Sequence, residues 1–395
     1  MCIRDRLNKE YTALKLFEYE AKRILAEYGV PTPRGELITN ESQIGKKAAI
    51  LKPPLVVKAQ VLIAGRGKAG GILFAVSFEK AKKAAEKLLK MQIMGIPVKS
   101  VLIEEKIQIK RELYFGITID RFKQSYVAIA SGVGGMDVEE TATKTPEKII
   151  RIFINSQQGL RPFQARQIAR KMGYAGNQLL DLEEILGRLY CIGMNYDAEL
   201  IEMNPLVETV DGKFVAADAR VIIDDNALFR HSEYKKRLVG GESELSSQEI
   251  EALKNDLAYV KLEGNIGVIG NGAGLVMATL DTIKYYGGKP ADFLDVGGGA
   301  SSEKIAVALK IVLSDPKVKA LFVNILGGIT RCDEVALGIL EAKEKIGVTK
   351  PMVIRLVGTN ENEGKRILRE AGIHVLESME EAAQLVVEVA GIRDE

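Results

Sequence analysis

Two patterns of apolar and polar residues divide the chain. Up to about residue 225, short β-prone runs such as "PLVVKAQVLI" and "RELYFGITID" mix with amphipathic helices predicted for residues 78–90 and 163–174. This mixture is typical of an α+β domain. From Asn265 onward, strands and helices of about a dozen residues alternate strictly, which predicts βαβ units and a doubly wound parallel α/β sheet. The polar, charged residues 231–257 are predicted to link the two parts and to include some helix.

The start of the chain lacks such a pattern. The first convincing element is the amphipathic stretch "LFEYEAKRILAEYG", which ends at Gly29 in the manner of a helix C-terminus. Residues 1–14 precede it without clear periodicity. We therefore expect them to be an appended extension that the fold does not need.

The composition excludes several classes of protein. The chain has 395 residues, enough for two or three domains, and 55 Lys and Arg balance 53 Asp and Glu. Such a balance predicts no nucleic-acid partner and no anionic membrane surface. There is no apolar run near the roughly 18 residues of a membrane span, and no signal-peptide core. Three scattered cysteines cannot build a disulfide framework or a zinc site, so we expect a cytoplasmic protein.

The stretch "ELIEMNPLVETVDGKFVAADAR", residues 199–220, has one polar face. Glu202 and Asn204 are two positions apart and point to the same side of a strand, whereas the residues between and beside them are apolar. The "VDGK" turn folds the next run back antiparallel and brings Asp218 roughly opposite them. Carboxylate and amide oxygens are ligands that Mg²⁺ accepts. A hairpin whose polar face meets only water is the alternative that this pattern leaves open.

The segment "IAGRGKAGGILFAV" contains Gly65, Gly67 and Gly70 at dinucleotide-fingerprint spacing. That fingerprint requires a helix directly after the glycines, but the β-prone "ILFAV" follows. A Walker loop also fails, since no Lys-Ser or Lys-Thr pair follows Gly70. We interpret the segment as a flexible hairpin between two strands, carrying Arg66 and Lys68, that can close over phosphates as a lid.

Further candidates flank this hairpin. Lys58 interrupts an apolar run, and a phosphate contact would offset the cost of its burial. The alternative is a lysine at a strand edge that reaches water. Glu104, Glu105 and Glu112 lie near strand ends, where they could accept hydrogen bonds from an adenine amino group and ribose hydroxyls, although isolated glutamates are usually surface residues. Together these residues indicate a nucleotide site without a P-loop.

Three glycine-rich turns follow successive strands in the second half of the chain. They are "NGAG", "GGGAS" and "GGIT". In open parallel sheets ligands bind at the carboxyl ends of the strands, where glycine lets a ligand approach backbone N–H groups and helix N-termini favour anions. A single such turn would reflect turn chemistry alone. Three in successive units indicate a site.

Eight motifs together resemble one family, the β subunit of ADP-forming succinyl-CoA synthetase (succinate–CoA ligase). They are "LFEYEAKRIL", "VVKAQVLIAGRGKAGG", "RELYFG", "LIEMNPLV", "DNALFR", "NIGVIGNGAGL", "DFLDVGGGAS" and "NILGGITRCD". The resemblance runs from about Lys15 to the C-terminus. It implies an ATP-grasp domain over residues 15–245 and a flavodoxin-like CoA-ligase domain over residues 258–395.

The same resemblance implies site residues. For the nucleotide, ATP or ADP, it implies Lys58, Gly65, Arg66, Gly67, Glu104, Ile107 and Glu112. One Mg²⁺ per subunit would be held by Asn204 and Asp218. Glu202, beside the metal, resembles the glutamate that steadies the phosphohistidine at the nucleotide site.

The carboxylic acid substrate is expected in the second domain. The positions that the resemblance implies for it are Asn271, Gly328, Ile329 and Thr330. One departure from the family is Leu62 with Ile63, where many relatives read His-Ala before the glycines. We expect that departure to affect local packing only.

In this family a phosphoryl group passes from the nucleotide to a histidine and then to succinate, and CoA displaces phosphate. The two histidines, His231 and His374, do not lie in glycine-flanked loops. The resemblance therefore implies that an α subunit supplies the carrier histidine and most of the CoA site, in a heterodimer or heterotetramer. Such an enzyme serves the tricarboxylic acid cycle.

The sequence leaves alternatives open. "NGAG" and "GGIT" do not separate succinate from malate, and a malate–CoA ligase or a citrate-cleaving relative would use the same chemistry. ATP and GTP share the phosphate site and are not separated either. A non-catalytic nucleotide-binding regulatory subunit is an alternative of another class, against which the presence of Lys58, Glu202, Asn204 and Asp218 argues.

Overall fold

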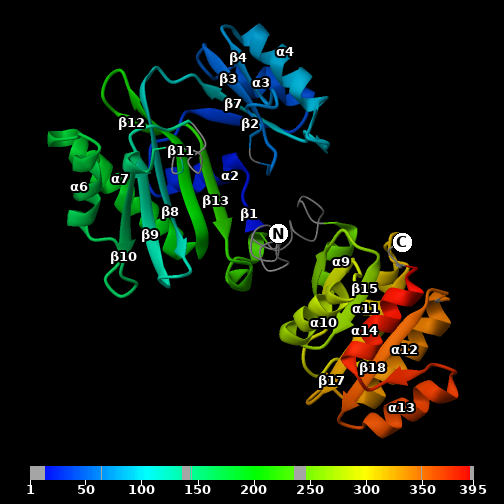
Figure 1. Cartoon of the computed structure of the whole chain (residues 1–395). Helices are drawn as coiled ribbons and strands as arrows, with labels where there is room; N and C mark the ends of the chain where they lie inside the picture. The colour runs from blue at the N-terminus through cyan, green and yellow to red at the C-terminus, as the bar shows by residue number, and fades with distance from the viewer. Residues whose placement is uncertain are drawn as a thin grey trace. The chain divides into compact units, whose positions relative to one another are not determined.

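The computed structural model describes residues 14–63, 65–135, 143, 145–234, 246–347 and 349–391. The chain divides into two compact units, and the division falls between residues 235 and 236 (Figure 1). That point lies inside the polar segment predicted to link the two parts. Residues 1–13, which we expect to be dispensable, lie outside the described ranges.

The first unit contains a small antiparallel sheet in the order β2-β7-β3-β4. Its strands are β2 (Gly35–Ile38), β7 (Val101–Glu105), β3 (Leu55–Ala59) and β4 (Ile72–Ala75). Near it lie the helices α3 (Ile44–Ala48) and α4 (Phe78–Leu89), the 3₁₀ turn η1 (Glu41–Gln43), and the short pair β5 (Gln92–Ile93) and β6 (Ile96–Pro97). Alternate residues of β3 and β7, such as Val57 and Ile103, pack into one core with Leu88 of α4. Side chains alternate across a strand, so Lys58 and Glu104 belong to the opposite face.

A larger antiparallel sheet follows in the same unit, in the order β1-β13-β11-β8-β9-β10, with β12 paired to β11. Its strands are β1 (Leu14–Lys15), β13 (Ala219–Ile223), β11 (Ala198–Thr209), β8 (Ile109–Asp120), β9 (Ser125–Ser131), β10 (Ile149–Ile154) and β12 (Phe214–Ala216). The accompanying helical elements are α2 (Glu18–Glu27), α6 (Pro162–Lys171), α7 (Gly176–Asn195), η2 (Pro146–Lys148) and η3 (Asp225–Ala227).

The position of Leu14 corrects one expectation. The lack of periodicity places this residue in the appended extension, but it pairs with Ile223 in β1 and is buried. A buried leucine in a sheet contributes to the core, so Leu14 belongs to the first unit rather than to an extension.

The second unit is a flavodoxin-like sheet in the order β14-β16-β15-β17-β18-β19. Its strands are β14 (Ala258–Lys261), β15 (Ile266–Gly270), β16 (Asp292–Asp295), β17 (Ala320–Gly327), β18 (Met352–Gly358) and β19 (Val375–Leu376). From β15 onward all pairs are parallel, and numbering these five strands along the chain gives the order 2-1-3-4-5. The edge strand β14 runs antiparallel to β16, which the strict alternation did not predict.

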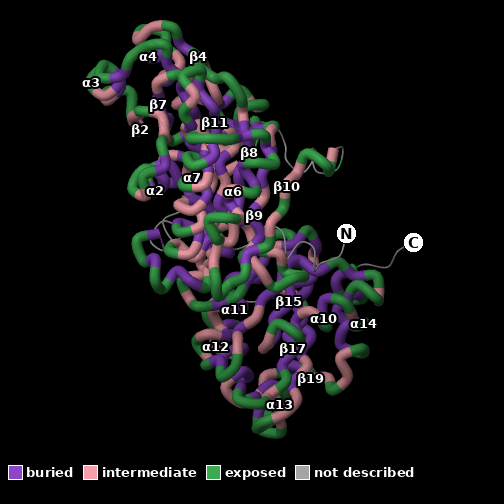
Figure 2. Tube along the Cα trace, turned by 90° about the vertical axis from the view of Figure 1, so that its left-hand side faces the viewer, coloured by how far each residue is buried: buried purple, intermediate pink, exposed green. Residues whose placement is uncertain are grey.

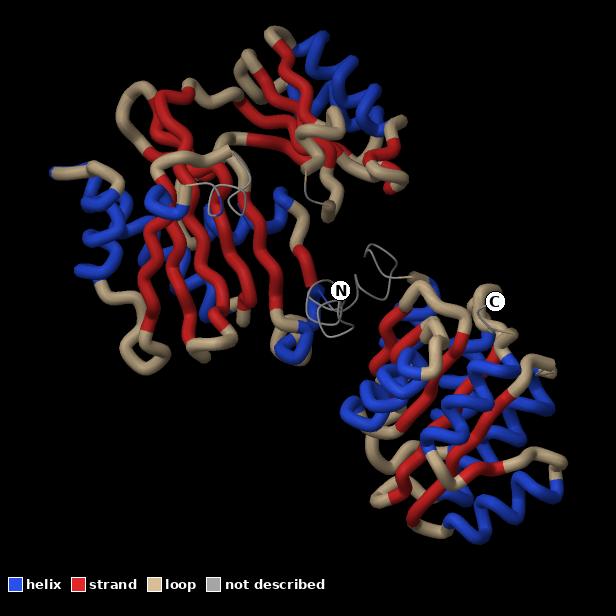
Figure 3. The backbone as a smooth tube through the Cα atoms, in the orientation of Figure 1, coloured by secondary structure: helices blue, strands red, loops and turns tan. Residues whose placement is uncertain are grey.

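Helices cover both faces of this sheet, as Figure 3 shows in blue around red strands. They are α9 (Ser247–Lys254), α10 (Ala273–Tyr285), α11 (Ser302–Leu313), α12 (Cys332–Ile346), α13 (Glu361–Glu370) and α14 (Met379–Val389). One core joins the strands to α10 and α14, and a second joins them to α9, α11, α12 and α13. Because both faces are covered, the inner strands β15 and β17 are largely buried (Figure 2). Within the described ranges, no helix has both the length and the apolar character of a membrane span.

Candidate active site

The first unit holds a cavity of about 240 Å³. Its walls come from the start of α2, the loop between β3 and β4, and the strands β11 and β13. The predicted site residues that line it are Gly65, Arg66, Gly67, Glu202, Asn204 and Asp218. Residues from the proposed phosphate lid and the proposed metal hairpin therefore share one pocket.

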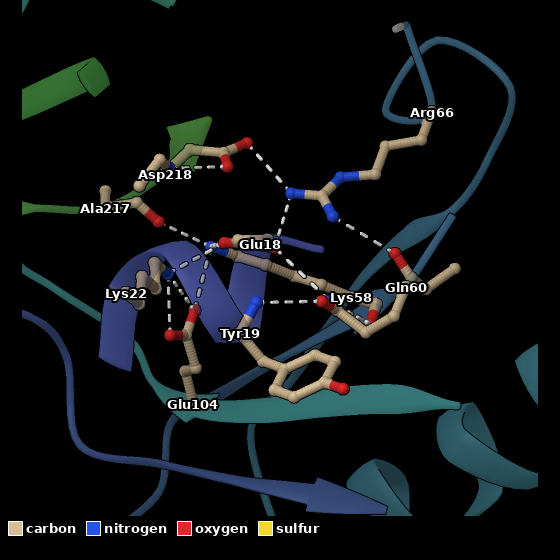
Figure 4. Close-up of polar contacts among 11 residues, drawn as sticks. Glu18, Tyr19, Lys22, Lys58, Gln60, Arg66, Glu104, Ala217 and Asp218 are labelled. Carbon is tan, nitrogen blue, oxygen red and sulfur yellow. Dashed lines mark hydrogen bonds and ion pairs between the residues drawn. The ribbon is translucent and has the colours of Figure 1, made fainter. Parts of the chain in front are cut away.

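The glycine-rich segment forms the connection of a β-hairpin, as the sequence predicted. Strands β3 and β4 pair antiparallel up to Lys58 and Ile72, so the loop begins and ends on paired backbone. Gly65 has φ +78°, a conformation that favours glycine. Figure 4 shows Arg66 reaching back from this loop toward α2 and Asp218.

Lys58 is engaged on all sides. Its ammonium lies 2.8 Å from Glu18 Oε1 and 2.8 Å from Glu104 Oε2, and it donates to the carbonyl oxygen of Ala217 at 2.6 Å. Burial alone would lower the pKa of Lys58, but the charges of Glu18, Glu104 and Asp218 outweigh burial and raise it. An ammonium has three N–H groups, so a phosphate contact by Lys58 requires one of these acceptors to be exchanged.

Glu18 is the centre of this cluster, although it was not among the residues predicted from the sequence. Its buried carboxylate accepts hydrogen bonds from Lys58 and Arg66 and lies 2.7 Å from the ammonium of Lys22 (Figure 4). Burial would raise the pKa of Glu18, but the three surrounding cations hold it well below its usual range. The available signal was the Glu–Lys pair at i, i+4 in the first turns of α2, which usually indicates a solvent-exposed pair.

Arg66 links the glycine-rich loop between β3 and β4 to Asp218 of the hairpin. Its Nη2 donates to Glu18 and, at 2.9 Å, to Asp218 Oδ2, while Nη1 donates to the carbonyl oxygen of Ala59 at 3.2 Å. Burial and then the charge of Glu18 raise the pKa of the Asp218 carboxyl, against the opposing effect of Arg66. In this arrangement the guanidinium is the cation bonded to the Asp218 carboxylate.

The two proposed metal ligands lie on neighbouring segments of the backbone, and both line the cavity. The hairpin pairs β11 with β12, and the backbone N–H of Asn204 donates to the carbonyl oxygen of Asp218 at 3.3 Å. Asn204 Oδ1 also accepts from the N–H of Gly135 at 2.8 Å. No group of three or more His, Cys, Asp or Glu side chains in the described ranges is placed to hold a metal ion. One carboxylate and one amide oxygen fit Mg²⁺, which keeps several waters and binds substrate phosphates.

Glu202 lies on the same face of the hairpin. It is paired across the sheet with Arg220 on one side and Gly116 on the other. Its Oε2 accepts a hydrogen bond from the Tyr114 hydroxyl at 2.9 Å, and Oε1 lies 3.8 Å from Arg220 Nη1. Because Gly116 has no side chain, the Tyr114 ring can lie above it. Arg220 and Tyr114 were not among the predicted site residues.

The remaining nucleotide candidates lie on or near the connection from the small sheet to the large one. Glu104 sits in the ion cluster, with both carboxylate oxygens within 2.8 Å of the Lys22 ammonium, so its carboxylate faces cations rather than open space. Ile107 falls between β7 and β8, and Glu112 lies in β8 opposite Val207. Neither Ile107 nor Glu112 lines the cavity.

In the second unit the acid-site candidates gather at the carboxyl ends of β15 and β17. Asn271 Nδ2 donates to the carbonyl oxygen of Leu326 at 2.8 Å and to Thr330 Oγ1 at 3.2 Å. The buried Thr330 Oγ1 also accepts from the N–H of Gly299 at 3.0 Å. Thr330 thereby links all three glycine-rich turns at the topological switch point of the sheet.

The neighbouring positions differ in how they meet solvent. Ile329 is 85% exposed, so its side chain projects away from the sheet between Gly328 and the buried Thr330. Asp295, at the end of β16, accepts from the N–H groups of Gly272 and Gly297 at 2.6 and 2.7 Å. This aspartate, which no sequence signal marked, holds two of the glycine-rich turns in place.

Neither described histidine is built as a carrier. The His231 ring is buried, stacks on Tyr196 at 5.7 Å and places Nε2 2.9 Å from Asp197 Oδ2. His374 is exposed, not enclosed by its apolar neighbours, and precedes β19. It therefore lies at the amino ends of the parallel strands, opposite the edge with Asn271 and Thr330.

Comparisons with known families agree with the division of the chain into two units. Residues 15–208 match the model of the ATP-grasp domain, and residues 269–389 match that of the CoA-ligase. Fold and family matches together define the class: the chain combines an ATP-grasp domain with a flavodoxin-like CoA-ligase domain.

Full-length relatives are more specific. The chain is 48% identical to the β subunit of ADP-forming succinate–CoA ligase of Ignicoccus hospitalis, over 95% of this chain and 99% of that protein. It is 46% identical to the subunit of the same name from Pyrobaculum calidifontis, over 95% and 100% of the two chains. The chain therefore belongs to the family of succinate–CoA ligase β subunits.

A solved structure supports the fold. ATP citrate lyase from Methanothrix soehngenii, determined with citrate and coenzyme A, superposes with a TM-score of 0.74 over 95% of this chain and 100% of that chain. The two sequences are only 21% identical. The likeness therefore concerns the fold alone.

Proposed function

We propose that this chain is the β subunit of an ADP-forming succinate–CoA ligase. With an α subunit it would interconvert ATP, succinate and CoA with ADP, phosphate and succinyl-CoA. The observation that carries the proposal is the meeting of the glycine-rich loop with Glu202, Asn204 and Asp218 in one cavity. A phosphate-binding loop and oxygen ligands in the same pocket suit a magnesium nucleotide.

Each residue has a defined part in this proposal. Asn204 and Asp218 would hold Mg²⁺, which neutralises charge on the phosphates when bound. The backbone at Gly65 and Gly67 lets the loop approach the phosphates closely. Arg66 can exchange its contact with Asp218 for a phosphate oxygen while Nη2 stays bonded to Glu18 and Nη1 to the carbonyl oxygen of Ala59. Glu202 faces the same cavity and would steady the imidazole of an incoming phosphohistidine.

The second unit would bind the acid. Asn271 and Thr330 are held by hydrogen bonds at the switch point, beside backbone N–H groups of glycine-rich turns. The N-termini of the helices that follow these turns favour a carboxylate. Gly328 and Ile329 lie in the same turn and complete the proposed acid site.

The carrier histidine would come from the α subunit. His231 is packed against Tyr196, and His374 lies at the wrong edge of its sheet. The α subunit would also bind most of the CoA, in a heterodimer or heterotetramer. The thiols of Cys191 and Cys332 are free, which agrees with the cytoplasmic location that we also propose.

Two alternative functions compete with this proposal. A malate–CoA ligase or a citrate-cleaving enzyme would use the same nucleotide site, and the likeness to ATP citrate lyase makes citrate a natural comparison. A regulatory subunit would not need Glu202 in the nucleotide pocket, so the geometry favours an enzyme.

The deciding experiment uses the chain co-purified with its α partner. CoA-dependent release of phosphate is measured with succinate, malate and citrate, each with ATP and with GTP. We expect succinate with ATP to give the highest kcat/KM. A higher value with malate or citrate would replace the acid in this proposal, and binding of nucleotide without any CoA-dependent turnover would support the regulatory alternative.

A further inference from the structure

The cavity in the first unit contains a cation that the proposed reaction has not yet used. Arg220 lies in β13, directly opposite Glu202 of β11 and two residues after Asp218. Residues two apart on a strand share a face, so Asp218 and Arg220 lie beside Glu202 and Asn204 on the same side of the sheet. All four line the cavity.

The two arginines that line this cavity differ in how far they are engaged. Arg66 donates to two carboxylates and a backbone carbonyl. Among the described residues, no group accepts a hydrogen bond from the guanidinium of Arg220, whose one ion pair, to Glu202, spans 3.8 Å. That distance is too long for a hydrogen bond. The donors of Arg220 are thus available to a ligand, whereas those of Arg66 must first be released.

Exposure sets Arg220 apart in the same way. Its side chain is 40% exposed, against 18% for Glu202 and 10% for Arg66. A group carried in from another protein chain would meet Arg220 and Glu202 before it meets the buried cluster around Glu18. The position suits contact with a partner's phosphorylated side chain better than contact with the nucleotide alone.

We propose that Arg220 contacts the phosphoryl group as it passes between the nucleotide and the histidine of the α subunit. This inference rests on the proposed function. In the forward step the bond between the γ-phosphorus and the bridging oxygen breaks, and its electron pair stays on the nucleoside diphosphate. A lone pair of one imidazole nitrogen forms the new N–P bond, while the other ring nitrogen keeps its proton.

Arg220 and Glu202 then act on opposite charges of the same group. The planar guanidinium donates two parallel hydrogen bonds to phosphoryl oxygens, whose negative charge it offsets during transfer. The carboxylate of Glu202 faces the imidazole, which becomes positively charged when the N–P bond forms. The hydrogen bond from Tyr114 holds Glu202 in place while Arg220 turns from it to the phosphoryl group.

The test compares Arg220→Gln, Arg220→Lys and a control, Arg151→Gln, in the complex with the α subunit. Arg151 is an exposed arginine of β10 in the same sheet, outside the cavity. Two quantities are measured for each protein: the rate at which label from γ-labelled ATP appears on the partner's histidine, and the Kd for ADP with Mg²⁺.

We expect Arg220→Gln to slow labelling by about 100-fold or more, as loss of one transition-state donor does. Its Kd for ADP should change by less than about threefold, because ADP lacks the transferred group and the buried cluster is intact. Arg220→Lys should recover part of the rate, since it keeps the charge but not the paired donors. Arg151→Gln should match the unmodified complex.

Two results would overturn the inference alone. One is labelling by Arg220→Gln at the rate of the unmodified complex. The other is an equal loss of labelling and of ADP affinity, which would make Arg220 a residue of nucleotide affinity rather than of transfer. If the unmodified complex itself placed no label on the partner's histidine, both the proposed function and this inference would be wrong.

Discussion

Glu18 Oε1 and the Lys58 ammonium lie 2.8 Å apart, although Glu18 begins the helix α2 and Lys58 belongs to β3 of the small sheet. The same carboxylate also meets Arg66 of the glycine-rich loop and Lys22. One buried anion therefore joins three cations from three parts of the first unit. Removing one member of a buried ionic cluster is costly, because the remaining charges are left without a partner.

Glu18→Gln should destabilise the first unit by about 3 kcal/mol, since it removes the charge but keeps the shape of the side chain. Urea unfolding of the chain would measure the change. Glu27→Gln in the same helix is the control, because Glu27 is exposed and its ion pair with Arg23 is long, at 3.8 Å. Its cost should stay within about 0.5 kcal/mol. Equal losses in the free energy of unfolding would show that the buried cluster stabilises the first unit no more than an exposed ion pair does.

The same pair of proteins should differ in their dependence on pH. The surrounding cations hold the pKa of Glu18 below its usual value in the folded protein. The Glu18 carboxylate therefore stabilises the fold fully above the pKa of the unfolded chain, and this stabilisation is lost as the pH falls through the lower pKa of the folded state. The stability gap between unmodified protein and Glu18→Gln should thus stay constant from pH 8 to about 5 and narrow below about 4.5. Urea unfolding at each pH would measure this gap. A stability gap that already narrows between pH 8 and 6 would contradict the prediction.

Asp218→Asn should remove the effect of Mg²⁺ on nucleotide affinity, because it replaces the anionic ligand of the proposed metal site. Nucleotide titrations with and without Mg²⁺ would show a gain of at least about tenfold in the unmodified chain and little in the variant. Asp211→Asn is the matched control, since Asp211 lies in the turn of the same hairpin and its side-chain contacts among the described residues are with the nearby Thr209 and Lys213. A full Mg²⁺ response in Asp218→Asn would refute the metal assignment.

The chain alone, incubated with γ-labelled ATP, should acquire no acid-labile label on His231 or His374. His231 is fixed between Tyr196 and Asp197, and His374 lies at the amino ends of the strands of the second unit. Adding the α subunit should place label on that subunit. Mass spectrometry of the separated chains would locate it, and label on either histidine of this chain would refute the two-subunit mechanism.

Thr330→Val should raise the KM for the acid while leaving phosphorylation of the partner's histidine by ATP unchanged. The variant leaves the N–H of Gly299 and the amide of Asn271 without their shared acceptor, which costs about 1–3 kcal/mol and loosens the three turns. Thr330→Ser keeps the hydroxyl and serves as the control. If ATP-driven phosphorylation fell as much as acid-dependent turnover, Thr330 would not be specific to the acid site.

Local chemistry allowed much of this architecture to be predicted. The "VDGK" turn and the alternating residues around Glu202 fixed the polar hairpin, because both signals act within a few residues. The β-prone run after the glycines correctly ruled out a dinucleotide fingerprint, since Ile72 begins a strand and not a helix. Strict alternation likewise predicted the parallel sheet of the second unit.

Features that depend on distant segments were missed. Glu18 and Lys22 resemble an ordinary solvent-exposed pair until β3 and β7 bury them. Arg220 shows its relation to Glu202 only once β13 pairs with β11. The helix α7 was not among the predicted elements; its N-cap is Ala175, whose side chain cannot cap, and Gly176 follows, so the usual start signal is absent.

The edge strands of the second unit have a consequence for aggregation. Both are short: β14 has four residues and β19 has two. Short edge strands leave little unpaired backbone for the sheet of another molecule to join. A fragment that began after Lys261 would lose β14 and expose the edge of β16, where Phe293 and Leu294 are now buried. Residues 258–261 therefore cover the edge of β16, which would otherwise be open to pairing with the sheet of another molecule.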